Sequence, residues 1–174
     1  MNTLQNIYSI SSQVEMNSYL HWRWMLEKQF RSLIVVYEDI TTCLNVIKEL
    51  SVCIESEKNR PQRMIFIQNM VKEIRNLLDE LYPFQKLEED LLFLASSSYA
   101  EFLISQCELL ELELPYILEA LRLFYTRTQR MTVRITKIEA RELTRCLTLT
   151  IHPLQKHLDQ IERELFPAVL EWLQ

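Results

Sequence analysis

Residues 70–91 read MVKEIRNLLDELYPFQKLEEDL, and this stretch has the pattern of an amphipathic helix. Apolar side chains recur there at alternating steps of four and three residues, which places them on one face of an α-helix. The positions of this face are Met70, Ile74, Leu77, Leu81, Phe84, Glu88 and Leu91. Such a face is buried only by packing against other helices. Glu88 is the exception, because it places a carboxylate in an otherwise apolar row.

Three further stretches of the chain carry the same spacing. They run from Leu26 to Ile47, from Leu103 to Phe124 and from Leu147 to Trp172. Four helices that each need partners, joined by short connections, predict antiparallel neighbours. We therefore expect an all-α, up-down-up-down antiparallel four-helix bundle that forms a single domain over residues 1–174.

The ends of these helices are marked without glycine, which the 174-residue chain lacks. Ser12–Glu15, Ser98–Glu101 and Thr136–Glu139 have the spacing of a capping box, in which a hydroxyl and a carboxylate bind main-chain N–H groups of the first turn. Pro61 suits the first turn of another helix. These signals place the helices at about 12–53, 60–95, 98–126 and 136–173.

Composition excludes several classes of protein. No run approaches the roughly 18 apolar residues of a membrane span, and the first residues do not resemble a secretory signal. The four cysteines form no CxxC pair, so we expect neither a zinc finger nor a disulfide framework but a reduced, cytoplasmic protein. A phosphate-binding glycine loop is absent, and candidate nucleophiles lie on helix faces without an oxyanion loop. We expect no enzymatic activity.

Charge is distributed unevenly along the chain. Residues 77–120 hold ten acidic side chains against one lysine, whereas residues 122–145 hold seven basic against two acidic ones. The basic stretch predicts a binding site for an anionic partner, and the alternative is a solvated end that balances the acidic one. Few aromatic residues accompany its arginines, which argues against nucleic acid. The residues proposed for this contact are Arg127, Arg130, Arg134, Lys137 and Arg141.

A polar layer is predicted inside the bundle. In antiparallel neighbours, residues at one level have numbers that sum to a constant, and this rule brings Arg23, Glu88 and His157 together. One interpretation is a structural layer in which Glu88 is neutralised by Arg23 or His157 and fixes helix register. The other is a metal site, because carboxylates and imidazoles from facing helices bind iron or manganese in bundles.

Residues 157–167, HLDQIERELFP, resemble the last metal-binding helix of hemerythrin-like proteins. Residues 84–93, FQKLEEDLLF, and residues 21–24, HWRW, are similar to two other helices of that family. The resemblance implies an iron or oxygen site that would use Glu88, His157, Glu162 and His21. The chain departs from the family pattern, since Phe84 stands where the second helix has a histidine. Its three histidines are fewer than a full di-iron centre requires.

These features lead to one principal hypothesis and two alternatives. We expect a non-catalytic protein on a degenerate hemerythrin-like scaffold that acts by binding another protein and carries no cofactor. The first alternative is a protein that binds iron or oxygen, and the second is an adaptor whose basic end binds an anionic partner. The sequence leaves open whether the chain forms a homo-oligomer.

Overall fold

The computed structural model describes the main chain of residues 2–96, 101–129 and 135–174, and the side chains of most of residues 16–94, 114–129 and 135–174. These residues are helical and contain no β-strand. The long helices are α1 (Asn2–Ser56), α2 (Arg60–Ser96), α3 (Glu101–Gln129) and α4 (Lys137–Gln160). A π-helical turn, η1 (Ile161–Leu165), joins α4 to the short helix α5 (Phe166–Trp172).

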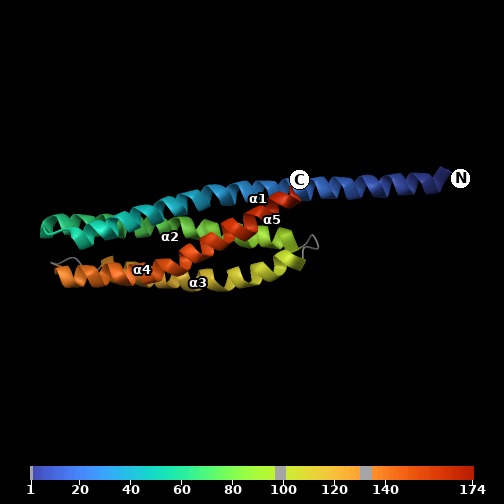
Figure 1. The fold of residues 1–174 in the computed structure, drawn as a ribbon. Helices are drawn as coiled ribbons and strands as arrows, with labels where there is room; N and C mark the ends of the chain where they lie inside the picture. Colours follow the sequence, from blue (N-terminus) through green and yellow to red (C-terminus); the bar gives the residue numbers. More distant parts are fainter. Residues whose placement is uncertain (1, 97–100, 130–134) are drawn as a thin grey trace.

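The long helices lie side by side, as the amphipathic spacing requires (Figure 1). The chain reverses direction between α1 and α2, between α2 and α3, and between α3 and α4. Helix α4 crosses the bundle obliquely, so that α5 ends beside α1. The N-terminal part of α1 continues well past the other helices. None of the helices in the described ranges is long and apolar enough to cross a membrane.

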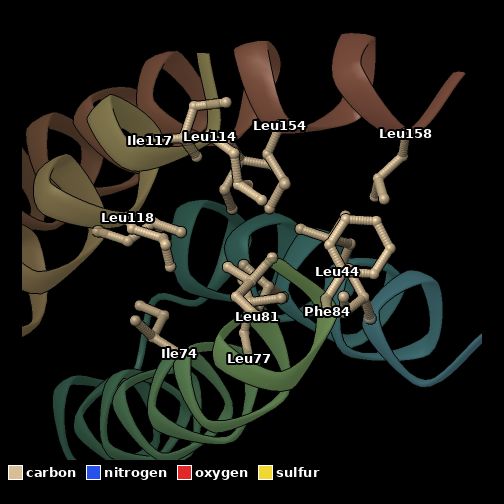
Figure 2. Close-up of a cluster of buried hydrophobic side chains, with 14 of the residues drawn as sticks. Leu44, Ile74, Leu77, Leu81, Phe84, Leu114, Ile117, Leu118, Leu154 and Leu158 are labelled. Carbon is tan, nitrogen blue, oxygen red and sulfur yellow. The ribbon is translucent and has the colours of Figure 1, made fainter. Parts of the chain in front are cut away.

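Buried side chains from four helices form the core. In Figure 2, Leu44 of α1, Leu81 and Phe84 of α2, Leu114 of α3 and Leu154 of α4 converge on one another. The buried positions of α2 are those of the row that the sequence predicts, from Met70 to Leu91. Each fully buried leucine or phenylalanine contributes about 1.5–3 kcal/mol of hydrophobic free energy. An all-helical bundle held by these rows is therefore confirmed.

The predicted helix starts have three different outcomes. Thr136 forms its capping box, because Glu139 N–H donates to Thr136 Oγ1 at 3.2 Å and Thr136 N–H donates to Glu139 Oε2 at 2.7 Å. The start at Ser12 is wrong, since α1 begins at Asn2. Residues 2–11 contain no proline or glycine that would stop the helix from extending backwards. The box at Ser98–Glu101 lies partly outside the described residues.

The turn between α1 and α2 depends on a buried arginine. Arg63 lies in the first turn of α2 and is only 5% exposed. Its Nη2 and Nε atoms both donate to the main-chain carbonyl of Glu57, at 2.6 and 3.2 Å. This contact satisfies a carbonyl just beyond the end of α1 that has no partner within the helix. The guanidinium therefore fixes the turn at the end of the molecule opposite to the projecting part of α1.

The last predicted helix, 136–173, is divided by the π-turn. Its apolar row contains two successive steps of four, Ile161 to Leu165 to Val169, and all three side chains are buried. Two such steps drift off one face of an α-helix, whereas an extra residue in the turn restores the alignment. Pro167 follows directly and has no N–H to donate. Phe166 N–H donates to the carbonyl of Ile161, five residues back, and the π-turn thus absorbs both irregularities.

We expect Phe84→Ala to lower the free energy of unfolding by about 3–5 kcal/mol, because it removes a fully buried aromatic ring and leaves a cavity. Tyr82→Ala, two residues away on the same helix, is the matched control. Its side chain is 68% exposed, so we expect a change within about 0.5 kcal/mol. Urea denaturation followed by circular dichroism measures both. Equal losses in the two variants would contradict this core.

Candidate functional site

A carboxylate and an imidazole meet inside the core. Glu88 projects from α2 and His157 from α4, and their side chains are 3% and 0% exposed. His157 Nε2 lies 3.3 Å from Glu88 Oε1 and 3.4 Å from Glu88 Oε2. The ring nitrogen thus faces the edge of the carboxylate. Two groups that can share a proton are held together in a region of low dielectric constant.

An aromatic ring lies against this pair. Phe84, one turn before Glu88, packs edge-on against the ring of His157, with centroids 6.4 Å apart and planes 72° apart. Among the described residues, no hydrogen-bond partner reaches His157 Nδ1. An uncompensated polar atom of this kind costs about 1–3 kcal/mol of stability. One ring nitrogen of His157 therefore contacts Glu88 and the other has no hydrogen-bond partner among the described residues. Loss of either side chain would leave the other without its polar contact.

Arg23 lies elsewhere than in the predicted layer. Its Nη2 donates to the main-chain carbonyl of Leu173, beyond the end of α5. Its neighbour Trp22 donates from Nε1 to the carbonyl of Leu94 at 3.1 Å and packs on Trp172, with ring centroids 5.9 Å apart. Arg23 thus ties α1 to the C-terminal helix. The contact between Trp22 and Leu94 shows that this part of α1 lies opposite the end of α2, beyond the level of Glu88.

The remaining candidate metal ligands are also separate from the pair. His21 is exposed and stacks on Trp24, with centroids 6.0 Å apart. Glu162 is exposed and accepts a hydrogen bond of 2.8 Å from the hydroxyl of Tyr37.

The described residues contain no cluster of three or more His, Cys, Asp or Glu side chains that could hold a metal ion. Protein metal sites usually take three or four ligands from the protein. Glu88 and His157 alone therefore do not fit the iron centre that the hemerythrin resemblance implies.

The basic end of the bundle contains an apolar groove between α3 and α4. Of the residues proposed there, Arg127, Lys137 and Arg141 are exposed, and Arg130 and Arg134 lie outside the described residues. The groove has a volume of about 430 Å³. It is lined by Ala120, Leu123, Phe124, Arg127, Thr128, Glu139, Glu142, Leu143, Cys146 and Thr150.

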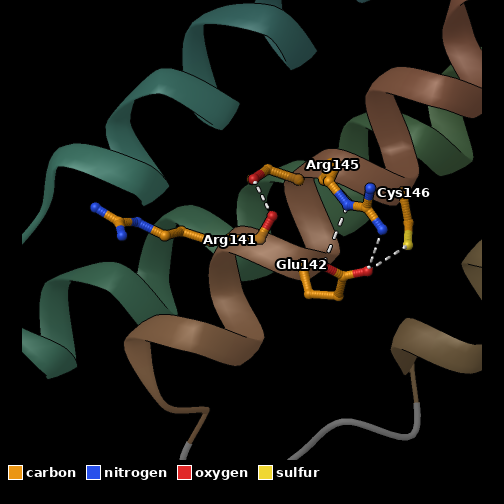
Figure 3. A network of polar contacts seen from close by, with 5 residues as sticks. Arg141, Glu142, Arg145 and Cys146 are labelled. Atoms are coloured by element: carbon orange, nitrogen blue, oxygen red, sulfur yellow. Dashed lines mark hydrogen bonds and ion pairs between the residues drawn. The ribbon is translucent and has the colours of Figure 1, made fainter.

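Both carboxylates of this groove already have partners. Glu142 accepts from Arg145 Nη2 at 2.9 Å and from Arg145 Nε at 3.2 Å, and Cys146 Sγ lies 3.9 Å from Glu142 Oε1 (Figure 3). The Arg145 hydrogen bonds hold the pKa of Glu142 below its usual value, and the Thr136 main-chain N–H does the same for the pKa of Glu139. Both acids therefore stay ionised at neutral pH. Arg145 offsets the charge of Glu142, whereas the main-chain N–H of Thr136 is neutral and leaves the charge of Glu139 in place.

Arg127 contributes an additional positive charge to this groove. Its guanidinium forms no ion pair with any residue that the structure describes. In Figure 3, the side chain of Arg141 extends away from the Glu142–Arg145 pair. The groove is therefore largely apolar, with Arg127, unpaired among the described residues, on its α3 side and the ionised Glu139 on its α4 side.

Reasoning from the sequence alone missed this groove, although a signal for it exists. Tyr116, Ala120, Leu123 and Arg127 recur at steps of four, three and four on α3 and are all exposed. This is a second helical row, parallel to the buried one that contains Leu114, Ile117 and Leu121. This exposed row is not apparent when only the rows expected to be buried are compared.

We expect the Glu88–His157 pair to show strong energetic coupling. His157→Leu or Glu88→Leu alone leaves a buried polar group without its partner and should lower the free energy of unfolding by about 3–5 kcal/mol. The double variant removes both groups and should recover much of that loss. A double-mutant cycle in urea measures the coupling free energy. Additive effects of the two substitutions would show that the groups do not interact.

A second prediction concerns Tyr37, whose pKa is raised to about 12, first by burial and then by the hydrogen bond and charge of Glu162. Because the folded-state pKa exceeds the ordinary value of 10.0, the neutral tyrosine stabilises the fold below pH 10. That contribution is lost as the pH rises through 12. NMR titration of the ring signal, assigned with Tyr37→Phe, measures this pKa. Glu162→Gln should lower it, and an unchanged value would exclude the role of the Glu162 charge.

Comparison with models of known protein families, with characterised proteins and with solved structures gave no significant match. The similarity to hemerythrin-like proteins therefore stays a prediction from three short sequence motifs. Two features of the structure bear on function: the buried Glu88–His157 pair and the α3–α4 groove.

Proposed function

We propose that this chain is a non-catalytic binding protein that uses a hemerythrin-like, up-and-down bundle as its scaffold. It binds a protein partner at the end of the bundle that carries Arg127, Lys137 and Arg141. The observation that supports this proposal is the α3–α4 groove, where an apolar floor lies beside an arginine that is unpaired within the described residues and Glu142 is already paired with Arg145. Apolar concavities with a few polar groups are the usual form of binding sites.

The surroundings of the groove support protein binding. Leu123 in its wall is 50% exposed, and the side chains of Ile138 and Leu149 on α4 are 81% and 63% exposed. Large apolar side chains gathered on one part of a surface mark interaction sites more often than scattered ones do. A partner that covers them gains hydrophobic free energy, and the arginines determine which charge it carries.

The buried pair supports a scaffold role for the rest of the core. Glu88 and His157 are 3% and 0% exposed, so a substrate would reach them only if the helices separated. A paired carboxylate and imidazole on α2 and α4 penalise any other register of these two helices, because a shift leaves both groups unpaired. We assign the pair to the specificity of folding, and we propose no cofactor.

Charge reversal at the basic end tests this function. The variant Arg127→Glu/Arg141→Glu changes two exposed side chains, and Lys72→Glu/Lys86→Glu makes the same change of net charge on exposed positions of α2. Proteins that co-purify with the tagged chain from cells are quantified by mass spectrometry for each variant. We expect the arginine variant to lose partners that the wild type and the lysine variant both retain.

An identical set of partners in all three proteins would overturn the proposal. Loss of the same partners in both variants would also overturn it, because the effect would then follow net charge and not the basic end. Circular dichroism must show equal helicity in the three proteins, as expected for substitutions at exposed positions.

A further inference from the structure

We propose that the α3–α4 groove binds an amphipathic helix of another protein, with its apolar face on the groove floor and acidic residues beside Arg127. This inference rests on the proposed function and names the class of partner. It follows from the spacing of the groove residues, from their exposure and from the state of their charges.

The walls of the groove have helical spacing. On α3 the exposed row advances from Ala120 to Leu123 to Arg127, and on α4 the wall advances from Glu139 to Leu143 to Cys146. The intervals of three and four residues match the rows of side chains that one helix presents to another. A third helix can therefore insert its own side chains between these rows, as an amphipathic helix does in a hydrophobic groove.

The row continues beyond the groove on both helices. Tyr116, one turn before Ala120, is 77% exposed, and Leu149 precedes the groove residue Thr150. Because α3 and α4 run in opposite directions, both side chains lie toward the same end of the groove (Figure 1). Leu123 lies between this end and Arg127. The apolar surface is thus elongated along the helix axes, which suits a helix better than a small molecule.

The charges around the groove favour an acidic partner. In the described part of residues 122–145, the exposed basic side chains Arg122, Arg127, Lys137, Arg141 and Arg145 outnumber Glu139 and Glu142, and Glu142 is already paired with Arg145. A basic helix would therefore be repelled, above all by Arg127. An acidic helix instead supplies a carboxylate to a guanidinium that forms no ion pair within the described residues. Complementary charge at the side of an apolar groove fixes the choice and the orientation of the partner.

The projecting part of α1 from a second copy is the main rival occupant. Its exposed residues Met16, Tyr19, Leu20 and Trp24 have helical spacing and could fill an apolar groove. Glu15 is the only acidic residue among residues 1–24, however, and Arg23 offsets it. That segment offers Arg127 a single carboxylate, so the charges favour an acidic helix of a different protein over self-association.

Two labelled peptides test the inference with the full chain. Both have leucines at positions i, i+4, i+7 and i+11 of a helix, and their flanking positions are glutamate in one and lysine in the other. Fluorescence anisotropy measures their binding to the wild type and to the variants Arg127→Glu and Leu123→Glu. The control variant is Leu170→Glu, because Leu170 is an exposed leucine on α5, outside the groove. We expect the acidic peptide to bind the wild type on the order of tenfold more tightly than the basic one.

The variants locate the contact. Arg127→Glu should remove the preference for the acidic peptide, Leu123→Glu should weaken both peptides, and Leu170→Glu should change neither. Cys146 is exposed in the groove, so the bound acidic peptide should also slow its alkylation by iodoacetamide, whereas Cys53 on α1 should react as before. Mass spectrometry of proteolytic fragments follows each thiol separately.

Several results would overturn the inference. These are no binding of either peptide, equal binding of both by the wild type, or unaltered binding by Leu123→Glu. A wild type that dimerises in sedimentation equilibrium and becomes monomeric in Leu123→Glu would instead identify a second copy as the occupant. If charge reversal removes cellular partners while neither peptide binds, the proposed function stands and the helical partner is wrong.

Discussion

The mutual burial of the apolar rows of α1 to α4 is the constraint on which the rest of the structure depends. Once Leu81 and Phe84 face the core, the helical period fixes which side chains of α2 face outward, and the same holds for each neighbour. The outward row of α3 is therefore a consequence of its inward row. The α3–α4 groove lies along this outward row.

Against this apolar background, the Glu88–His157 contact is an unfavourable element that persists because both partners are present. Desolvation of either group alone is costly, and their contact at 3.3 Å offsets part of that cost. A hydrophobic pair of similar volume would cost the core little stability. The polar pair instead makes one register of α2 against α4 more favourable than the others, because other registers place a carboxylate among leucines and Phe84.

The parts of the fold that follow from local rules were predictable from the sequence. The buried row of α2 follows from spacing, and the start of α4 follows from the chemistry of Thr136 and Glu139. The contact between Glu88 and His157 was also predictable, because Glu88 interrupts the apolar row of α2 and His157 lies beside the apolar row of α4. The predictions that were wrong depend on tertiary geometry. Arg23 lies opposite the end of α2 and binds the Leu173 carbonyl, and the division at Ile161–Leu165 arises where packing and Pro167 together demand an extra residue.

The projecting part of α1 affects how the molecule behaves in solution. A helix that continues past the bundle makes the particle longer than a sphere of equal mass (Figure 1). Friction with the solvent depends on shape, so such a rod diffuses slowly and leaves a gel-filtration column early. Its elution volume would then suggest a larger assembly than is present. Light scattering, which reports mass directly, distinguishes an extended monomer of 21.0 kDa from a true dimer.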